Sequence, residues 1–253
     1  MKDSKANFIA KALAEVFVYF LATLGISDMI LNTAIIKKMR WVEDEILPST
    51  LLMCYLAPGL IIAGAYLIGN RNADYITLLV YIVSIMAGSY YGSGKVIKMD
   101  GASVRKFMGW AMIASIGALI VRLIVSAGTS GTAAGLHGWQ FLIAVPFFFA
   151  MGCLNTFGLP AKPPVLSFLL ILGLSPIAAL TVIAMGFVGP WTASIRYFKS
   201  GRYDKTMVKF AAVFGSIGAL IGSFFALSIN TYLLTAILIA VMAFVAYTML
   251  KEK

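Results

Sequence analysis

Charged residues are scarce in this sequence, because Asp, Glu, Lys and Arg together make up 12% of the 253 residues. Soluble domains carry about 25% charged and about 45–50% apolar residues, whereas this chain is 61% hydrophobic and has a mean hydropathy of +0.94. A soluble core of this length cannot hide so much apolar surface, so lipid must be the solvent. The apolar runs are continuous rather than alternating, which predicts transmembrane helices and not a transmembrane β-barrel.

Residue types that form metal and catalytic sites are also rare. The chain has one histidine, His137, and two cysteines, Cys54 and Cys153, which lie inside apolar runs. Their spacing fits no metal site or disulfide framework. The segment Gly88–Lys95 superficially resembles a phosphate loop, but the glycine spacing differs and Val96 stands where Ser or Thr is needed. We therefore expect no enzymatic activity, no metal and no cofactor.

Basic residues give the chain a formal net charge of +10, and they gather between the apolar runs. A nucleic-acid partner is not expected, because positive loops that face the cytoplasm explain this charge better. Both termini are then cytoplasmic, in a multi-pass protein of the plasma or inner membrane. The strongly basic segments are the N-terminus, Lys37–Arg40, Lys95–Lys106, Arg196–Lys209 and Lys251–Lys253.

The apolar segments occur in the same order in residues 1–127 and 139–253, on either side of a connector at 128–138. Each half starts with a broken apolar stretch and continues with three helices. The separation of Asp74 from Gly88 equals that of Asp204 from Gly218, which favours a duplication, although any membrane protein has recurring helices and loops. The first half has a stretch at 8–36 that is broken near Gly25, and helices at about 50–68, 75–91 and 107–126. The second has a stretch at 139–172 that is broken around 159–164, and helices at about 176–197, 207–227 and 232–250.

The loop charges require each broken stretch to begin and end on one side of the membrane, the first inside and the second outside. Both stretches are too short for two full spans of about 20 residues each. Two shorter helices that meet at a break fit better. The expected fold is therefore an all-α polytopic membrane protein with two inverted repeats, each a broken, re-entrant hairpin plus three transmembrane helices.

The order of short motifs resembles the family of sulfite exporter and toluene sulfonate uptake permeases (TauE/SafE-type permeases). The second half carries Gly152, Leu174-Ser175-Pro176, Arg196, Gly201, Asp204 and Gly218–Gly222; the first carries Leu24-Gly25-Ile26, Leu47–Thr50 and Asp74. The resemblance spans nearly the whole chain. It implies transport of sulfur oxyanions, organosulfonates or small carboxylates. The chain departs from the family where glycines after the breaks are replaced by Ser27-Asp28 and by Cys153–Thr156.

The two breaks are the expected solute site. A helix that ends in the bilayer leaves unpaired N–H and C=O groups, which are tolerable only when they line a cavity or meet a ligand. The N-terminal end of a half-helix also attracts anions. Alternatively, the polar residues near the breaks cap helices or bond between them. The candidate substrate-binding residues are Ser27, Asp28, Asn32, Thr33, Asn155, Thr156, Ser175 and Arg122.

Three ionisable residues within apolar runs leave alternatives open. Asp28 either couples solute movement to a proton or pairs structurally with a basic residue such as Arg122. Arg122 either reaches the outer interface or faces the solute path, and Glu15 faces the interface near Lys11. The predicted function is a secondary transporter of a small anion that works by alternating access, with a proton or Na⁺ as possible coupling ion and as a monomer or homodimer. The alternative is a passive anion channel.

Overall fold

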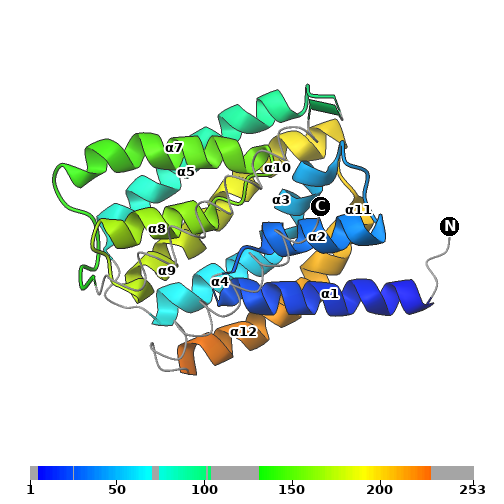
Figure 1. Ribbon diagram of the computed structural model, residues 1–253, viewed down its shortest axis with the longest axis horizontal. Helices are drawn as coiled ribbons and strands as arrows, with labels where there is room; N and C mark the ends of the chain where they lie inside the picture. Colours follow the sequence, from blue (N-terminus) through cyan, green and yellow to red (C-terminus); the bar gives the residue numbers. More distant parts are fainter. Residues whose placement is uncertain (1–4, 25, 70–73, 101, 104–130, 229–253) are drawn as a thin grey trace.

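The computed structural model describes residues 5–24, 26–69, 74–100, 102–103 and 131–228 (Figure 1). The regular elements in these ranges are all helices, and one isolated bridge joins Ala133 to Leu174. They are α1 (Lys5–Thr23), α2 (Asp28–Met39), α3 (Leu47–Cys54), α4 (Leu56–Gly69), α5 (Tyr75–Val96), α7 (Gln140–Thr156), α8 (Lys162–Ile171), α9 (Pro176–Ala184), the 3₁₀ turn η1 (Met185–Phe187), α10 (Val188–Ser200), α11 (Lys205–Phe210), the π-helical turn η2 (Ala211–Gly215) and α12 (Ser216–Ser228).

Several helices are long and apolar enough to span a membrane. By length and composition these are Lys5–Thr23, Tyr75–Val96, Pro176–Ser200 and Lys205–Ala226, and the bent pair α3–α4 is a fifth candidate. Large apolar side chains cover their outer faces, as at Leu13, Leu79 and Leu220, which are all exposed. These features confirm the prediction of an all-α membrane protein. The predicted helices at 107–126 and 232–250 lie outside the described residues.

Both predicted broken stretches are indeed interrupted. The first helix α1 ends at Thr23 and α2 begins at Asp28, while α7 ends at Thr156 and α8 begins at Lys162. Gly158, in the second break, has φ of 96°, a conformation that suits glycine because it has no Cβ. Figure 1 shows that the hairpins α1–α2 and α7–α8 enter from opposite ends of the molecule and meet near its middle.

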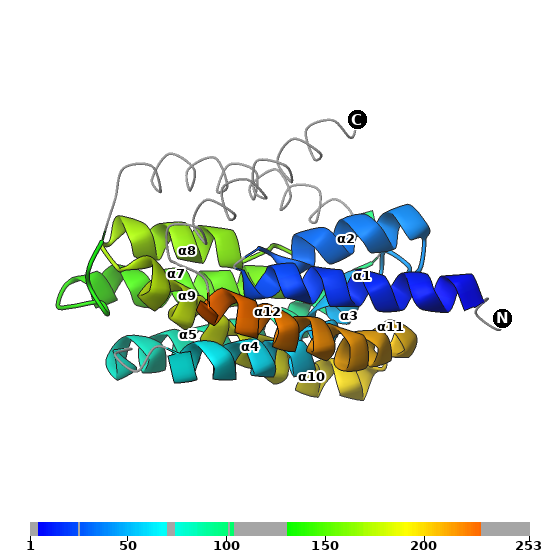
Figure 2. The same ribbon diagram turned by 90° about the horizontal axis from the view of Figure 1, so that it is seen from below.

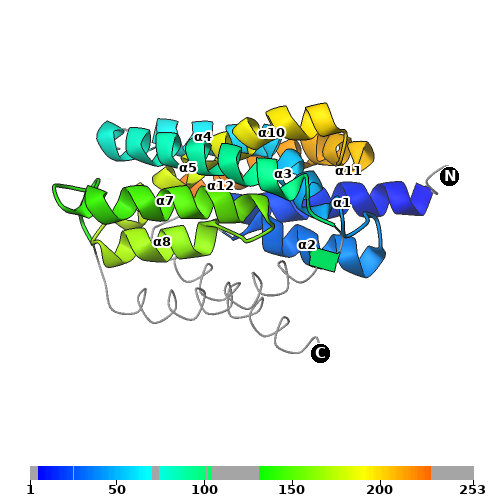
Figure 3. The same ribbon diagram turned by 90° about the horizontal axis from the view of Figure 1, so that it is seen from above.

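The two hairpins pack against long helices of the opposite half. Helix α1 lies along α12, and α7 lies along α5. A side chain on Gly88 of α5 would overlap the backbone carbonyl of Phe149, and one on Gly218 of α12 would overlap that of Val16. Figures 2 and 3 show α2 and α8 on one side of the molecule and α4, α5 and α10 on the other. Close helix crossings at glycine therefore hold each hairpin in place.

Proline interrupts the helix that follows each hairpin, within the predicted helices at 50–68 and 176–197. Helices α3 and α4 meet at an angle of 41°, and Pro58 lies in the first turn of α4. The turn η1 separates α9 from α10 just before Pro190. Because proline lacks an N–H and its ring clashes with the preceding turn, it bends or loosens a helix at such points.

Loops from both halves are joined at the end of the molecule that holds most of its basic residues, here called the basic end. The guanidinium of Arg202 donates hydrogen bonds to the carbonyls of Ile97 and Met99 and to the carboxylate of Glu45. At the opposite end the joints use backbone groups, as where the N–H of Leu136 donates to the hydroxyl of Thr77 at 2.8 Å. Figure 1 shows the C-terminal ends of α2, α5 and α10 and the start of α11 at this end. These helix ends and the residues next to them carry Lys37, Lys38, Arg40, Lys95, Lys98, Lys199 and Lys205.

Two aspartates cap the N-termini of corresponding helices, Asp74 on α5 and Asp204 on α11. The carboxylate of Asp74 accepts the backbone N–H of Thr77 at 2.9 Å, and Asp204 accepts that of Met207 at 2.7 Å. Burial acts to raise the pKa of Asp74, but the hydrogen bonds from Thr77 outweigh it and hold this pKa below the ordinary value of 3.8. The charged cap therefore stabilises the fold fully at pH values above the ordinary pKa of Asp74. This stabilisation is lost as the pH falls through the lowered pKa of the folded state.

We expect Asp74→Ala to lower the free energy of unfolding at neutral pH by about 1 kcal/mol, as for other N-cap losses. Thermal unfolding in detergent at neutral and acid pH measures this difference. The gap between wild type and variant should narrow as Asp74 of the wild type becomes protonated. Asp204→Ala is a matched cap loss and should cost a similar amount at neutral pH. An equal gap at every pH would contradict the role of the charged cap.

Candidate functional site

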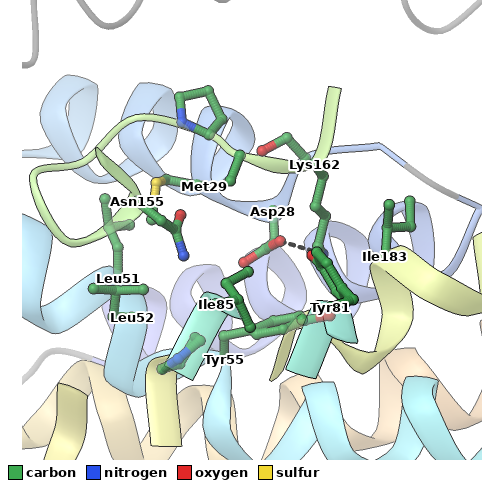
Figure 4. A pocket seen from close by; sticks show the side chains of 15 residues that line it. Asp28, Met29, Leu51, Leu52, Tyr55, Tyr81, Ile85, Asn155, Lys162 and Ile183 are labelled. Atoms are coloured by element: carbon green, nitrogen blue, oxygen red, sulfur yellow. Dashed lines mark hydrogen bonds and ion pairs between the residues drawn. The ribbon is translucent and has the colours of Figure 1, made fainter. Parts of the chain in front are cut away.

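A small cavity lies where the tips of the two hairpins meet (Figure 4). Its volume of about 30 Å³ has room for roughly two water molecules. Residues of both halves of the chain line it, so movement between the halves would change its shape. The lining residues are Ser27, Asp28, Met29, Leu51, Leu52, Tyr55, Tyr81, Ile85, Asn155, Pro160, Ala161, Lys162, Ile183, Gly186 and Pro190.

An ion pair between the two hairpin tips crosses this site. The Nζ of Lys162, the first residue of α8, lies 2.5 Å from a carboxylate oxygen of Asp28, the first residue of α2. Their side chains are only 15% and 8% exposed. A buried charge is costly without a partner, so each residue makes the other tolerable at this depth. Figure 4 shows the two side chains pointing toward each other across the cavity wall.

The helix ends add positive potential to this pair. Both α2 and α8 begin at the site, and neither has a side-chain hydrogen bond at its N-cap. Each helix N-terminus is equivalent to roughly half a positive elementary charge. The ammonium of Lys162 and the two helix ends therefore exceed the single negative charge of Asp28 by roughly one elementary charge. The electrostatic potential at the site is therefore positive, although among the described residues that line it only Lys162 has a cationic side chain.

Tyr55 lies under the ion pair, and its hydroxyl oxygen faces the ammonium of Lys162 while its O–H can still donate. The Nζ of Lys162 is 4.1 Å from the centroid of the Tyr55 ring, which stabilises the ammonium through a cation–π interaction. The hydroxyls of Tyr55 and Ser27 are both buried, and neither makes a hydrogen bond of good geometry, although the ammonium of Lys162 approaches the Tyr55 hydroxyl oxygen. Buried hydroxyls without partners are uncommon in folded proteins. Two potential donors thus face a cavity that already attracts negative charge.

Three of the predicted site residues reach the cavity. Ser27 and Asp28 come from the first break, and Asn155 comes from the last turn of α7. Figure 4 shows the amide of Asn155 directed into the space from the side opposite Lys162. The hairpins thus bring together a hydroxyl, a carboxylate and an amide that are far apart in the sequence.

The remaining predicted residues lie elsewhere. The hydroxyls of Thr33 and Thr156 donate to carbonyls of their own helices, those of Met29 and Cys153. The hydroxyl of Ser175 accepts the backbone N–H of Ala178 at 3.3 Å and caps α9. These three residues match the alternative that the sequence left open, local helix bonding. Arg122 lies outside the described residues.

Sequence reasoning missed the partner of Asp28. Its partner in the structure is Lys162, which the sequence analysis passed over as part of a proline-rich break. A lysine between Pro160 and Pro163, inside a stretch otherwise free of charge, is itself a signal of an intramembrane functional residue. Tyr55 was also missed, because an aromatic residue in an apolar run carries no distinctive pattern.

Glu15 and Asn32 form a second polar cluster between α1 and α2. The expectation that Glu15 faces the interface is wrong, because its side chain is 0% exposed and Asn32 is 1% exposed. The Asn32 amide approaches the Glu15 carboxyl. Neither carboxyl oxygen has a hydrogen-bond partner of good geometry, and the same holds for Asn32 Oδ1 and the hydroxyl of Tyr19. Cluster residues therefore have unused hydrogen-bonding capacity in the interior.

Comparison with known proteins identifies no relative from which a function can be transferred. The features of the molecule that bear on its function are the cavity, its ion pair and the arrangement of the two hairpins. No family model, no curated protein and no solved structure matches this chain.

Proposed function

We propose that this protein is a secondary transporter that moves a small anion across the plasma or inner membrane by alternating access. The observation that carries the proposal is the Lys162–Asp28 ion pair, which joins the tips of two half-length helices at a buried cavity. Charged residues at such depth are costly and usually functional. Helix ends inside the apolar layer are tolerable where they face a cavity or a ligand.

The two halves are proposed to be inverted repeats. In support, Gly88 and Gly92 of α5 contact α7 at Phe149 and Thr156. The matching glycines of α12, Gly218 and Gly222, contact α1 at Val16 and Thr23. Val16 precedes Thr23 by the same number of residues as Phe149 precedes Thr156. Equal spacing on both members of both pairs fits a duplicated unit whose hairpins have exchanged partners.

The orientation is proposed from the positions of the basic residues. The basic end is assigned to the cytoplasm, since short cytoplasmic loops carry an excess of Lys and Arg. The segments at the opposite end, residues 131–139 and 171–176, contain neither Lys nor Arg. The first hairpin then opens toward the cytoplasm and the second toward the outside, with both termini inside.

The proposed solute is a small anion such as a sulfur oxyanion, an organosulfonate or a small carboxylate. Lys162 supplies a full charge, and the N–H groups at the start of α2 and the amide of Asn155 supply further donors. The resemblance to sulfite exporter and sulfonate permeases agrees with this class but stays a prediction. A passive channel is less well supported, because a cavity with room for roughly two waters suits an occluded site that must open to each side in turn.

A thermal-shift screen of the purified protein tests the solute class. Sulfite, thiosulfate, sulfonates and short carboxylates are each added to wild type and to Asn155→Ala. A bound ligand at a hundred times its Kd stabilises the folded state by about 2.7 kcal/mol. Loss of one hydrogen bond to a charged ligand costs about 1.5–3 kcal/mol, so Asn155→Ala should weaken binding roughly tenfold to a hundredfold.

A matched control is Asn7→Ala, which removes the amide that accepts the indole N–H of Trp41 near the basic end. This variant should keep the solute-dependent shift of the wild type, whatever its basal stability. Uptake of the stabilising solute into proteoliposomes then separates transport from binding alone. The proposal fails if no anion of these classes shifts the wild type, or if a shift occurs without saturable uptake.

A further inference from the structure

Glu15 occupies an unusual position for an acid. It lies in the middle of α1, fully buried, and neither carboxyl oxygen makes a hydrogen bond of good geometry, although the Asn32 amide approaches the carboxyl. No ion pair to Glu15 is found among the described residues. Placing an isolated carboxylate in such surroundings is very costly, and a carboxyl group there becomes neutral by holding a proton.

The groups that face Glu15 set the electrostatic conditions for that proton. On α1 itself, Lys11 lies one turn toward the basic end with its Nζ 5.8 Å from the Trp41 and Phe210 rings, and Tyr19 lies one turn toward the cavity. From α2, Asn32 approaches the carboxyl and the charge of Asp28 acts on it. From α3, Cys54 interacts electrostatically with Glu15 and with Asp204, and Tyr55 is the next residue along the chain. Helix α11 carries Lys205 and Lys209, whereas η2 and α12 contain no titratable residue.

We propose that Glu15 and Asn32 form a proton-binding site that is separate from the Lys162–Asp28 pair and carries the coupling proton of the transporter. A protonated Glu15 has an O–H to donate, and Asn32 Oδ1 is a buried acceptor without a partner. Tyr19, on the same face of α1, has a hydroxyl without a partner and is placed to relay a proton toward the cavity. The assignment rests on the proposed transport function for its role, but not for the existence of the site.

A proton fits this site better than a metal ion. No group of three or more His, Cys, Asp or Glu side chains able to hold a metal occurs in the part of the chain that the structure describes. One carboxyl group and one amide oxygen are too few ligands for Na⁺ or Ca²⁺. For Ca²⁺, six or more oxygen ligands are usual. A single O–H hydrogen bond satisfies the same two groups.

The two sites are linked through Asp28, which lies one helical turn before Asn32 on α2. While Asp28 is paired with Lys162, its charge is largely neutralised. An anion that takes Lys162 as its partner leaves Asp28 uncompensated, and Asp28 then repels a negative charge on Glu15 more strongly. Solute binding therefore favours the protonated form of Glu15, and by reciprocity a protonated Glu15 favours solute binding. The coupling predicts that proton and anion move in the same direction.

Infrared difference spectroscopy of the purified protein tests the site without any transport. At neutral pH we expect the wild type to show the carbonyl stretch of a protonated carboxylic acid. Two control variants should show the same band: Glu43→Gln, which replaces an exposed acid, and Asp28→Asn. This band should be absent in Glu15→Gln, and in the wild type it should weaken at alkaline pH. A band that survives Glu15→Gln, or one that no pH and no solute changes, would overturn the proposal.

Uptake into proteoliposomes tests the coupling. Glu15→Gln mimics the protonated acid, so this variant should still exchange labelled for unlabelled solute. An inwardly directed proton gradient accelerates uptake by the wild type, and this acceleration should be at least tenfold smaller in Glu15→Gln. Glu43→Gln should retain that acceleration. An unaltered response of Glu15→Gln to the gradient would refute the coupling role. If the wild type moves no solute at all, the proposed function fails, and the infrared result alone still decides whether Glu15 binds and releases a proton.

Discussion

Replacing Lys162 by methionine is expected to abolish anion binding, with a loss of affinity of at least about a hundredfold. Methionine keeps much of the volume of the lysine chain but removes the only cationic side chain among the described residues that line the cavity. A hydrogen-bonded charge is worth up to about 3 kcal/mol to binding, which corresponds to that factor. The change also leaves Asp28 buried without its partner, so the variant should lose about 3–5 kcal/mol of stability.

The double variant Lys162→Met, Asp28→Asn separates these two effects. It removes both charges, so most of the lost stability should return, because a buried pair is often neutral in net energy compared with uncharged residues. Binding should not return. Lys98→Met, which replaces an exposed lysine at the basic end, is the matched control and should bind as the wild type does. Ligand-dependent thermal shifts measure both quantities, and wild-type affinity in Lys162→Met would refute the proposed site.

Adding one methyl group at Gly88 is expected to destabilise the protein, whereas the same change at Gly64 is not. A Cβ on Gly88 would overlap the backbone of Phe149, so α5 and α7 must separate. Overpacking of this kind costs about 1–3 kcal/mol, and here the obstacle is backbone that cannot rotate away. Gly64 of α4 has no atom within 4 Å of the added group, and alanine there should gain up to about 1 kcal/mol from helix propensity.

Thermal unfolding of Gly88→Ala, Gly218→Ala and Gly64→Ala in the same detergent checks this comparison. The first two should unfold at lower temperature than the wild type, because Gly218 meets the backbone of Val16 on α1 in the same way. Equal stability of Gly88→Ala and Gly64→Ala would mean that the α5–α7 crossing is looser than the structure shows. Unequal effects at Gly88 and Gly218 would weaken the case for equivalent hairpins.

Much of the fold was predictable from the sequence because lipid imposes simple rules. Long apolar runs specify helices, and glycine and proline mark where they stop. The sequence predicted breaks near Gly25 and at 159–164, and helices do end at Thr23 and Thr156. Equal spacing of Asp74 and Gly88, and of Asp204 and Gly218, predicted corresponding positions in the two halves, and in the structure these residues form two helix caps and two close crossings.

The candidate site was only partly predictable, because its key contact joins residues 134 positions apart. Sequence pattern identified Asp28 as costly in the membrane, but it could not choose among distant cations, and Lys162 was overlooked. The burial of Glu15 was missed for a related reason. An acid near a lysine on one helix looks interfacial until tertiary packing covers both with other helices.

The contacts of Arg202 make the two ends of the molecule respond differently to ionic strength. That contact depends on charge and is partly open to water, with side chains 31% and 50% exposed, so dissolved ions weaken it. The loops at the opposite end are held by hydrogen bonds of backbone groups, including the one from the Ala133 N–H to the Gly173 carbonyl. Ionic strength hardly affects such bonds. Ionic strength can therefore loosen the loop contacts at the basic end, which the proposed orientation assigns to the cytoplasm, while the contacts at the opposite end keep their strength.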